Sequence, residues 1–227
     1  MRIISIIPAY NEEKFIKKVV ECCGKHSDVV VVDDGSNDQT SAMAESAGAV
    51  VLKHSKNLGK GAAIKTGLKY LLKNSYDAVI LIDGDGQHDP SYIPQFVSIL
   101  DDAKIVMGSR FKEKFPENMP IQRKLSNKIT TRIIRYVTGY QITDSQSGYR
   151  LISSDIINLF VDIKYNDYVF ESEMLYKASK MGIKIKEISI PCDYGTEKSY
   201  VTLKNALNYV IFIIIHLLMK LKGRIYH

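Results

Sequence analysis

Short apolar runs alternate with helix-like segments through the first third of the chain, and this alternation constrains the fold more than any other feature. The runs are continuous and rich in Val and Ile. Such runs predict parallel strands buried on both faces, with a helix between successive strands. Strands are expected at Ile3 to Ile7, Val29 to Val32, Val50 to Leu52 and Ala78 to Ile82, and helices at Glu13 to Cys23, Ser41 to Ala47 and Gly61 to Leu72. The predicted fold class is a doubly wound α/β sheet, mostly parallel, with helices on both faces.

The second half of the chain is less regular and ends in a strongly apolar segment. We expect helices around Leu125 to Val137 and Glu171 to Met181, a strand from Ile183 to Ile190, and an apolar helix from Leu203 to Met219. No internal repeat, low-complexity segment or long linker is present. We therefore predict one domain over residues 1–202 and a C-terminal apolar helix with a basic end over residues 203–227.

The charge and cysteine content narrow the range of partners. Lys and Arg outnumber Asp and Glu by 31 to 25, which favours phosphate-rich ligands or anionic lipid but is too small a surplus to indicate nucleic acid. Cys22, Cys23 and Cys192 form no CxxC pair, so neither a disulfide framework nor a zinc site is predicted. The apolar stretch at the N-terminus reaches Pro8 and charged residues too soon for a signal peptide, and we expect a cytoplasmic protein.

Polar or turn-forming clusters follow four of the expected strands. They occupy residues 8–12, 33–36, 83–88 and 108–110. Open α/β sheets bind ligands outside the carboxyl ends of their strands, so these clusters indicate a binding site. The structural alternative is that their glycines and aspartates form turns and helix caps.

The most informative cluster is Asp83-Gly84-Asp85-Gly86-Gln87-His88. If the strand geometry continues, Asp83 and Asp85 point to the same side. Two carboxylates and the Gln87 amide are oxygen ligands of the kind that suit Mg²⁺ or Mn²⁺ together with substrate phosphates. The alternative is an Asp-Gly turn capped by its own side chains.

The other clusters supply residues suited to a nucleotide. Arg110 has the geometry for a bidentate phosphate contact, Asp33 and Asp34 suit a ribose or base, and Tyr10 and Glu12 suit the wall of a base pocket. Tyr10 is equally explained by surface packing, and Glu12 by a first-turn carboxylate that favours the helix dipole.

Two common nucleotide motifs are absent. Residues 57–63, NLGKGAA, do not form a Walker A loop, because Gly61 follows Lys60 where Ser or Thr is required. No G-x-G-x-x-G sequence follows the first strand. These observations disfavour a nucleoside triphosphatase and a dinucleotide-dependent oxidoreductase.

Six motifs follow one another along the chain: PAYNE at 8–12, VDDGS at 32–36, NLGKGAA at 57–63, DGDGQH at 83–88, GSR at 108–110 and DSQSGYR at 144–150. In this order and spacing the chain resembles family 2 glycosyltransferases of the dolichyl-phosphate mannose and glucose synthase type. The resemblance implies a GT-A type fold and a metal-dependent hexosyltransferase that uses Mg²⁺ or Mn²⁺. It also implies a UDP- or GDP-sugar donor and a polyprenyl phosphate acceptor.

The resemblance implies a role for each matching residue. It assigns the donor nucleotide to Pro8, Tyr10, Glu12, Val32 and Asp34, the ribose and base to Asp83 and Gly84, the metal to Asp85 and Gln87, and the donor and acceptor phosphates to Arg110 and Arg123. Asp85, Arg110 and Arg123 are the implied catalytic residues. The family closes over its donor with a motif resembling R-x-x-G-x-S-K. Here the corresponding residues 194–199 read YGTEKS, so Lys198 substitutes for the family lysine and the arginine has no clear counterpart.

The acceptor determines the expected mechanism. A phosphate monoester has a second pKa of about 6, so it attacks the anomeric carbon without a general base, and a single displacement inverts the configuration. A hydroxyl acceptor would need a base, for which Asp144, Asp167 and Glu171 are the candidates. Each is also explained as a loop cap or helix-start residue, and for Asp167 we favour that explanation.

The C-terminal segment suggests a lipid partner. Its 17 residues from Leu203 to Met219 span about 25 Å as a helix, short of the roughly 20 apolar residues that cross a bilayer. With Lys220, Lys222 and Arg224 after it, the segment is expected to lie in the membrane interface of a peripheral protein. The alternative is a core or oligomer-interface helix.

Two other functions compete with this one. A transferase of the same fold could use a saccharide or soluble acceptor, and a nucleotide-sugar-binding scaffold could retain the fold without activity. The apolar segment and the lack of an obvious catalytic Glu-Asp pair favour the lipid acceptor. The joint presence of Asp83, Asp85, Gln87 and Arg110 disfavours a scaffold, which would not need all four.

Overall fold

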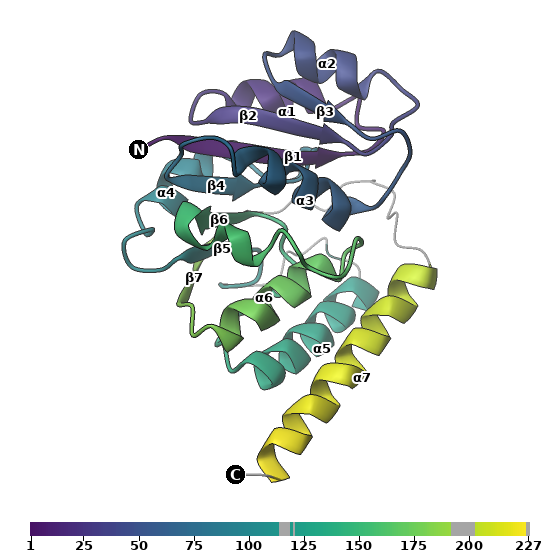
Figure 1. Ribbon diagram of the computed structural model, residues 1–227, viewed down its shortest axis with the longest axis vertical. Helices are drawn as coiled ribbons and strands as arrows, with labels where there is room; N and C mark the ends of the chain where they lie inside the picture. Colours follow the sequence, from purple (N-terminus) through teal and green to yellow (C-terminus); the bar gives the residue numbers. More distant parts are fainter. Residues whose placement is uncertain (114–118, 120, 192–202, 226–227) are drawn as a thin grey trace.

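The computed structural model describes residues 1–113, 119, 121–191 and 203–225, and within them the strands form a single twisted sheet (Figure 1). The strand order is β3-β2-β1-β4-β6-β5-β7. Every neighbouring pair is parallel except the two pairs that involve β6, which is antiparallel to β4 and to β5. The strands are β1 Ile3–Ala9, β2 Asp28–Asp33, β3 Val50–Lys53, β4 Ala78–Leu81, β5 Ile105–Ser109, β6 Arg150–Ser153 and β7 Ile185–Ser189. The predicted doubly wound, mostly parallel sheet of GT-A type is confirmed.

Helices cover both faces of the sheet because alternate residues of each strand point to opposite sides. In β1, Ile4 and Ile6 join a core that includes α3, α5 and α6, whereas Ile3 and Ile7 join a second core that includes α1, α2 and α4. The helices are α1 Ile16–Cys23, α2 Thr40–Ser46, α3 Lys60–Leu71, α4 Ile93–Val97, α5 Ile121–Thr138, α6 Phe170–Lys180 and α7 Leu203–Ile225, with short 3₁₀ turns η1 Pro90–Tyr92 and η2 Ser154–Leu159. A strand whose two faces are both covered by helices buries successive side chains, so its sequence is a continuous apolar run.

The strand that the sequence did not reveal is β6. Its four residues begin with Arg150, which is fully buried, and a charged residue at the start of a short segment gives no strand signal. The guanidinium donates hydrogen bonds to the carbonyl oxygens of Ser145, Ser147 and Glu171 at 3.1, 2.8 and 2.9 Å. Arg150 thus connects the loop at Ser145 and Ser147 to the first turn of α6.

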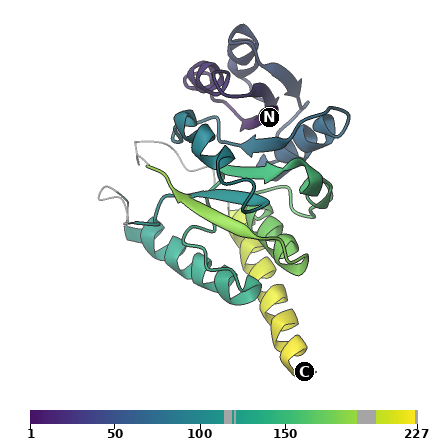
Figure 2. The same cartoon turned by 90° about the vertical axis from the view of Figure 1, so that its left-hand side faces the viewer.

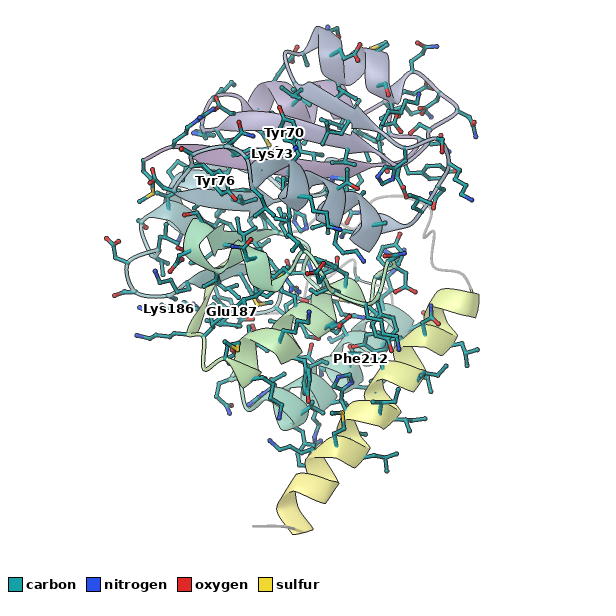
Figure 3. The ribbon with its side chains drawn as sticks, viewed as in Figure 1. Tyr70, Lys73, Tyr76, Lys186, Glu187 and Phe212 are labelled. Atoms are coloured by element: carbon teal, nitrogen blue, oxygen red, sulfur yellow. The ribbon has the colours of Figure 1, made fainter. Side chains whose placement is uncertain are left out.

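The C-terminal helix α7 has one packed side and one exposed side. Phe212 is fully buried in the core beside α6, with Tyr209 and Ile213 packed around it (Figure 3). On the opposite side Leu207, Ile214 and Leu218 remain at least half exposed. One side of the helix is thus packed like a core helix, while the other side leaves apolar residues exposed as a membrane-interface helix would. Contact with lipid stays a prediction, and so does the domain boundary at residue 202. None of the described helices combines the length and apolarity that crossing a membrane would need.

We expect Phe212→Ala to lower the free energy of unfolding by about 3 kcal/mol, because it leaves a cavity in a packed core. Ile214→Ala is the matched control on the same helix, where the side chain is 50% exposed, and it should cost no more than about 0.5 kcal/mol. Urea unfolding measures both. Equal midpoints for the two variants would show that α7 does not depend on this contact.

Candidate active site

The carboxyl ends of β1, β2, β4 and β5 meet at one edge of the sheet and bring the four predicted clusters together. Pro8 lies opposite Val32 in the ladder between β1 and β2, and both are buried. Asp83 follows β4, which pairs with β1, so it lies beside the loop that begins at Tyr10. Gly84 packs next to Ala9, where an added Cβ would lie 3.4 Å from the Ala9 Cβ. The fold thus brings the clusters at residues 8–12, 33–36 and 83–88 to one edge of the sheet, and their roles in binding stay predictions.

Lys60 joins three separate segments at this edge. Its ammonium lies 2.7 Å from Asp83 Oδ1 and 2.8 Å from Glu171 Oε1, with 16% of the lysine side chain exposed. Burial lowers the pKa of Lys60, but the two carboxylates raise it further, so it stays charged. Burial raises the pKa of Asp83, but the charge of Lys60 lowers it more, so the pKa of Asp83 lies below its usual range. Lys60 therefore keeps Asp83 ionised in a poorly solvated position.

Glycines allow this arrangement. Gly59 has φ of +102°, and a Cβ there would lie 2.4 Å from the Asn166 carbonyl oxygen. At Gly61 a Cβ would lie 2.8 Å from the Phe170 Cβ, and at Gly148 it would lie 2.7 Å from the Lys60 ammonium. The NLGKGAA motif is therefore a close-packing element that directs Lys60 toward Asp83, which explains why its resemblance to a phosphate loop is superficial.

Two aspartates at the end of β2 hold loops in place. Asp34 accepts hydrogen bonds from His54 and from the backbone of Leu58 and Gly59 at 2.7 to 2.9 Å. Asp33 is fully buried and accepts from the Ser36 amide and the Ser41 hydroxyl. Burial raises the pKa of Asp33, but these hydrogen bonds outweigh it and lower the value. These contacts hold the segment from His54 to Gly59 against the end of β2, and the donor role predicted for Asp34 stays a prediction.

Asp85 and Gln87 are the predicted metal ligands. The Gln87 amide N–H donates to Asp85 Oδ1 at 3.0 Å, so the turn named as the structural alternative is formed. Among the described residues no three His, Cys, Asp or Glu side chains cluster as a self-sufficient metal site. Mg²⁺ and Mn²⁺ often bind through one or two carboxylates and substrate phosphates, so the Asp85 carboxylate with the Gln87 amide suits a metal held jointly with the donor. Asp83 is committed to Lys60 and is less suited to the metal.

Arg110 forms a bidentate ion pair with Asp144. Its Nε and Nη2 lie 2.7 and 3.0 Å from the two carboxylate oxygens, and Asp144 is fully buried. Asn127 and the Gln146 amide also donate to Asp144. Burial raises the pKa of Asp144, but Arg110 lowers it below its usual range. Whether Arg110 also meets a phosphate stays a prediction.

The other two candidate bases are also engaged. Asp167 accepts from the Val169 amide and from Asn208 of α7, which agrees with the loop-cap role favoured for it. One oxygen of Glu171 pairs with Lys60, while Oε2 has no hydrogen-bond partner in the described part of the chain. Asp144 and Glu171 are buried, whereas Asp167 is partly exposed and is engaged by the Val169 amide and Asn208.

Three of the remaining predicted site residues lie in the loop after β1 and in α5. Tyr10 and Glu12 are half-buried in the loop after β1, where the Glu12 amide donates to Thr40 at 2.8 Å. Arg123 is exposed in the first turn of α5. Lys198 lies outside the described residues, so its predicted role stays untested.

Sequence reasoning gave no role to His88 or Lys60. Burial lowers the pKa of His88 to about 4, which leaves the ring neutral at pH 7. Its ring centre lies 5.4 Å from that of Tyr149, and its Nδ1 has no partner within the described residues. Both residues lie inside sequence motifs, His88 in DGDGQH and Lys60 in NLGKGAA. The motifs mark the two residues as candidates but do not show which side chains they contact.

Known proteins resemble this chain over most of its length. The family described as Glycosyl transferase family 2 matches residues 5–160. The UDP-N-acetylglucosamine–dolichyl-phosphate N-acetylglucosaminyltransferase of Methanococcus voltae is 35% identical, over 83% of this chain and 84% of that protein. The undecaprenyl-phosphate mannosyltransferase of Micrococcus luteus is 31% identical, over 84% of this chain and 83% of that protein.

A solved structure agrees on the fold. The glucosyl-3-phosphoglycerate synthase of Mycobacterium tuberculosis, crystallised with Mn²⁺ and UDP-glucose, superposes with a TM-score of 0.71. The alignment covers 96% of this chain and 78% of that one at 21% identity. At this identity the likeness extends to the fold alone.

We expect Lys60→Met to cost about 3 kcal/mol of stability at pH 7, because it leaves the buried Glu171 and the partly buried Asp83 without a counter-charge. Adding Glu171→Gln should recover part of that loss. Without Lys60, burial raises the folded-state pKa of Asp83 above its unfolded value, so the deficit should narrow as the pH falls through that raised pKa. Urea unfolding between pH 4 and 8 measures this.

The control for this prediction is Lys69→Met, an exposed lysine on the same helix, which should change stability by no more than about 0.5 kcal/mol. If Lys60→Met and Lys69→Met unfold alike at every pH, the ion pair does not stabilise the site.

Proposed function

The chain belongs to glycosyl transferase family 2, and we propose that it transfers a hexose from a UDP- or GDP-sugar to a polyprenyl phosphate at the cytoplasmic face of the membrane, with inversion at the anomeric carbon. The observation that supports this most directly is the DGDGQH segment at the end of β4, facing the loop after β1 at the ligand-binding edge of the sheet. Two relatives above 30% identity are named as transferases that act on dolichyl or undecaprenyl phosphate.

The donor binds across the carboxyl ends of β1, β2 and β4 in this proposal. Pro8, Tyr10, Glu12, Val32 and Asp34 surround the nucleotide, and Asp83 and Gly84 approach its ribose and base. An ionised carboxylate accepts hydrogen bonds from ribose hydroxyls, and the Lys60 charge favours that ionised form of Asp83. Because Asp34 is tied to Leu58 and Gly59, the pocket wall is rigid before the donor arrives.

Asp85 and Gln87 hold Mg²⁺ or Mn²⁺ in this proposal. The ion supplies electrostatic stabilisation of the charge that develops on the leaving nucleoside diphosphate. Its ligand set is incomplete without the donor, so metal and nucleotide should bind cooperatively. The M. tuberculosis synthase, which shares the fold, was crystallised with Mn²⁺ and UDP-glucose.

A phosphate acceptor agrees with the state of the nearby carboxylates. Asp144 is bound by Arg110, Asp167 by a turn and Asn208, and one oxygen of Glu171 by Lys60, so each of the three candidate general bases is already engaged. A polyprenyl phosphate is ionised at neutral pH and needs none. Arg110 and Arg123 then orient the donor and acceptor phosphates, and Lys198 closes over the donor.

The alternative is a soluble acceptor on the same fold. The M. tuberculosis synthase was also solved with phosphoglyceric acid, so this fold accommodates a small phosphorylated acceptor. The two proposals differ in the molecule that stimulates donor consumption.

We expect acceptor-dependent release of the nucleoside diphosphate when purified protein, Mg²⁺ or Mn²⁺ and a short polyprenyl phosphate are supplied with one donor from a panel of UDP- and GDP-sugars. Asp85→Ala should lower this turnover by at least about a hundredfold while the protein remains folded, because the metal loses a carboxylate. Unchanged turnover in Asp85→Ala would remove the metal assignment. Donor binding without consumption on the lipid phosphate would redirect the search to soluble acceptors.

Arg123→Ala should raise the KM for the polyprenyl phosphate by roughly tenfold while leaving donor affinity unchanged, since one exposed charge contact to a phosphate is lost. Steady-state kinetics with each substrate varied in turn measures this. A change in donor affinity with an unaltered acceptor KM would reassign the residue. Arg110→Ala is a poorer test, because it would strand the buried carboxylate of Asp144.

A further inference from the structure

Exposed apolar side chains gather on two neighbouring helices. Of the twenty large apolar side chains that are exposed among the described residues, eleven belong to α5 or α7. On α5, Ile121, Leu125 and Ile129 are spaced four residues apart and are 80, 58 and 50% exposed. Residues four apart lie on one side of a helix, so they form a stripe. On α7 the exposed residues are Leu207, Val210, Ile211, Ile214, Ile215, Leu218 and Met219.

The same two helices contain an excess of positive charge. The sequence of α5 has five Lys and Arg and no Asp or Glu, and that of α7 has four and none. Their surplus of nine exceeds the surplus of six in the whole chain, so the remainder is acidic overall. Exposed apolar residues combined with basic residues are typical of helices that lie in the interface of an anionic membrane.

The two helices lie together. The Lys220 ammonium of α7 is 3.5 Å from the Val137 carbonyl oxygen of α5, and several residues of the helices are in contact. Figures 1 and 2 show both helices at the end of the molecule opposite β2 and β3. The buried sides of both, Ile134 on α5 and Phe212 on α7, join the same core, which leaves their other sides to the solvent.

We propose that α5 and α7 form one surface that binds an anionic bilayer, with α5 contributing as much as the C-terminal helix. The proposal rests on the proposed function, because a lipid acceptor requires the site to reach the membrane. Arg123, the predicted acceptor-phosphate residue, lies in the first turn of α5, next to the exposed Ile121 and Leu125. A second copy of the chain is a poorer occupant, because two surfaces of like charge repel each other.

The test compares binding to vesicles of phosphatidylcholine with 30% phosphatidylglycerol, which contain no acceptor. The apolar variant is Leu125→Ser with Ile129→Ser, and its control is Met43→Ser with Leu72→Ser, two exposed apolar residues elsewhere. The charge variant is Lys128→Glu with Arg132→Glu, and its control is Lys17→Glu with Lys18→Glu on α1. Urea unfolding of all four ensures that the variants are folded.

Cosedimentation should show at least a tenfold loss of vesicle binding for both α5 variants and less than twofold for the controls. A basic residue near anionic headgroups strengthens binding by about fivefold, so binding of the charge variant should also depend less on salt concentration. Binding of the α5 variants at the wild-type level would overturn the proposal. So would a wild type that ignores vesicles while its α5 variants convert from dimers to monomers in sedimentation.

Turnover on a short, detergent-soluble polyprenyl phosphate separates this proposal from the proposed function. The α5 variants should retain wild-type turnover there, since none of the replaced residues is assigned to the site. A wild type that binds vesicles through α5 but has no turnover with any donor would uphold the surface and refute the function. Equal losses of turnover and of vesicle binding in the α5 variants would assign those residues to the site and overturn the proposal.

Discussion

The candidate site depends on the ammonium of Lys60 between Asp83 and Glu171. These residues come from the start of α3, the end of β4 and the start of α6, so one charge connects three segments that are distant in the sequence. The two carboxylates favour the charged form of Lys60, and the Lys60 charge favours the ionised form of Asp83. Gly59, Gly61 and Gly148 make room for the contact, which accounts for glycine in two of the six motifs.

Around this ion pair, the buried acidic groups each have a defined partner. Asp34 holds the loop before α3, and Asp144 holds Arg110 while Glu187 of the edge strand β7 accepts hydrogen bonds from Thr143 and the Asp144 amide. These contacts hold the loops at this edge of the sheet in defined positions. A fixed, charged edge suits a highly charged donor, because little reorganisation is needed when the diphosphate arrives.

The C-terminal helix connects this site to the apolar surface. Asn208 donates a hydrogen bond to Asp167 at 2.7 Å, and Ser172 donates one to the Tyr209 hydroxyl at 3.3 Å. These contacts flank Glu171, which pairs with Lys60. A helix that bound lipid on its outer side would thus be attached, on its inner side, to the segment that positions the central ion pair.

The sequence by itself determined the layered α/β fold and the edge at which the site forms. Strand and helix periodicity are local, and parallel strands necessarily present their carboxyl ends together, so residues 8–12 and 83–88 could be placed in advance. Only the tertiary structure decided that Lys60 meets Glu171, that Arg110 meets Asp144, that a strand begins at the buried Arg150, and which side of α7 is packed. Each of these features depends on contacts between residues that are far apart in the sequence. Such contacts form only when distant segments pack against each other in the folded chain, and no local pattern of residues specifies that packing.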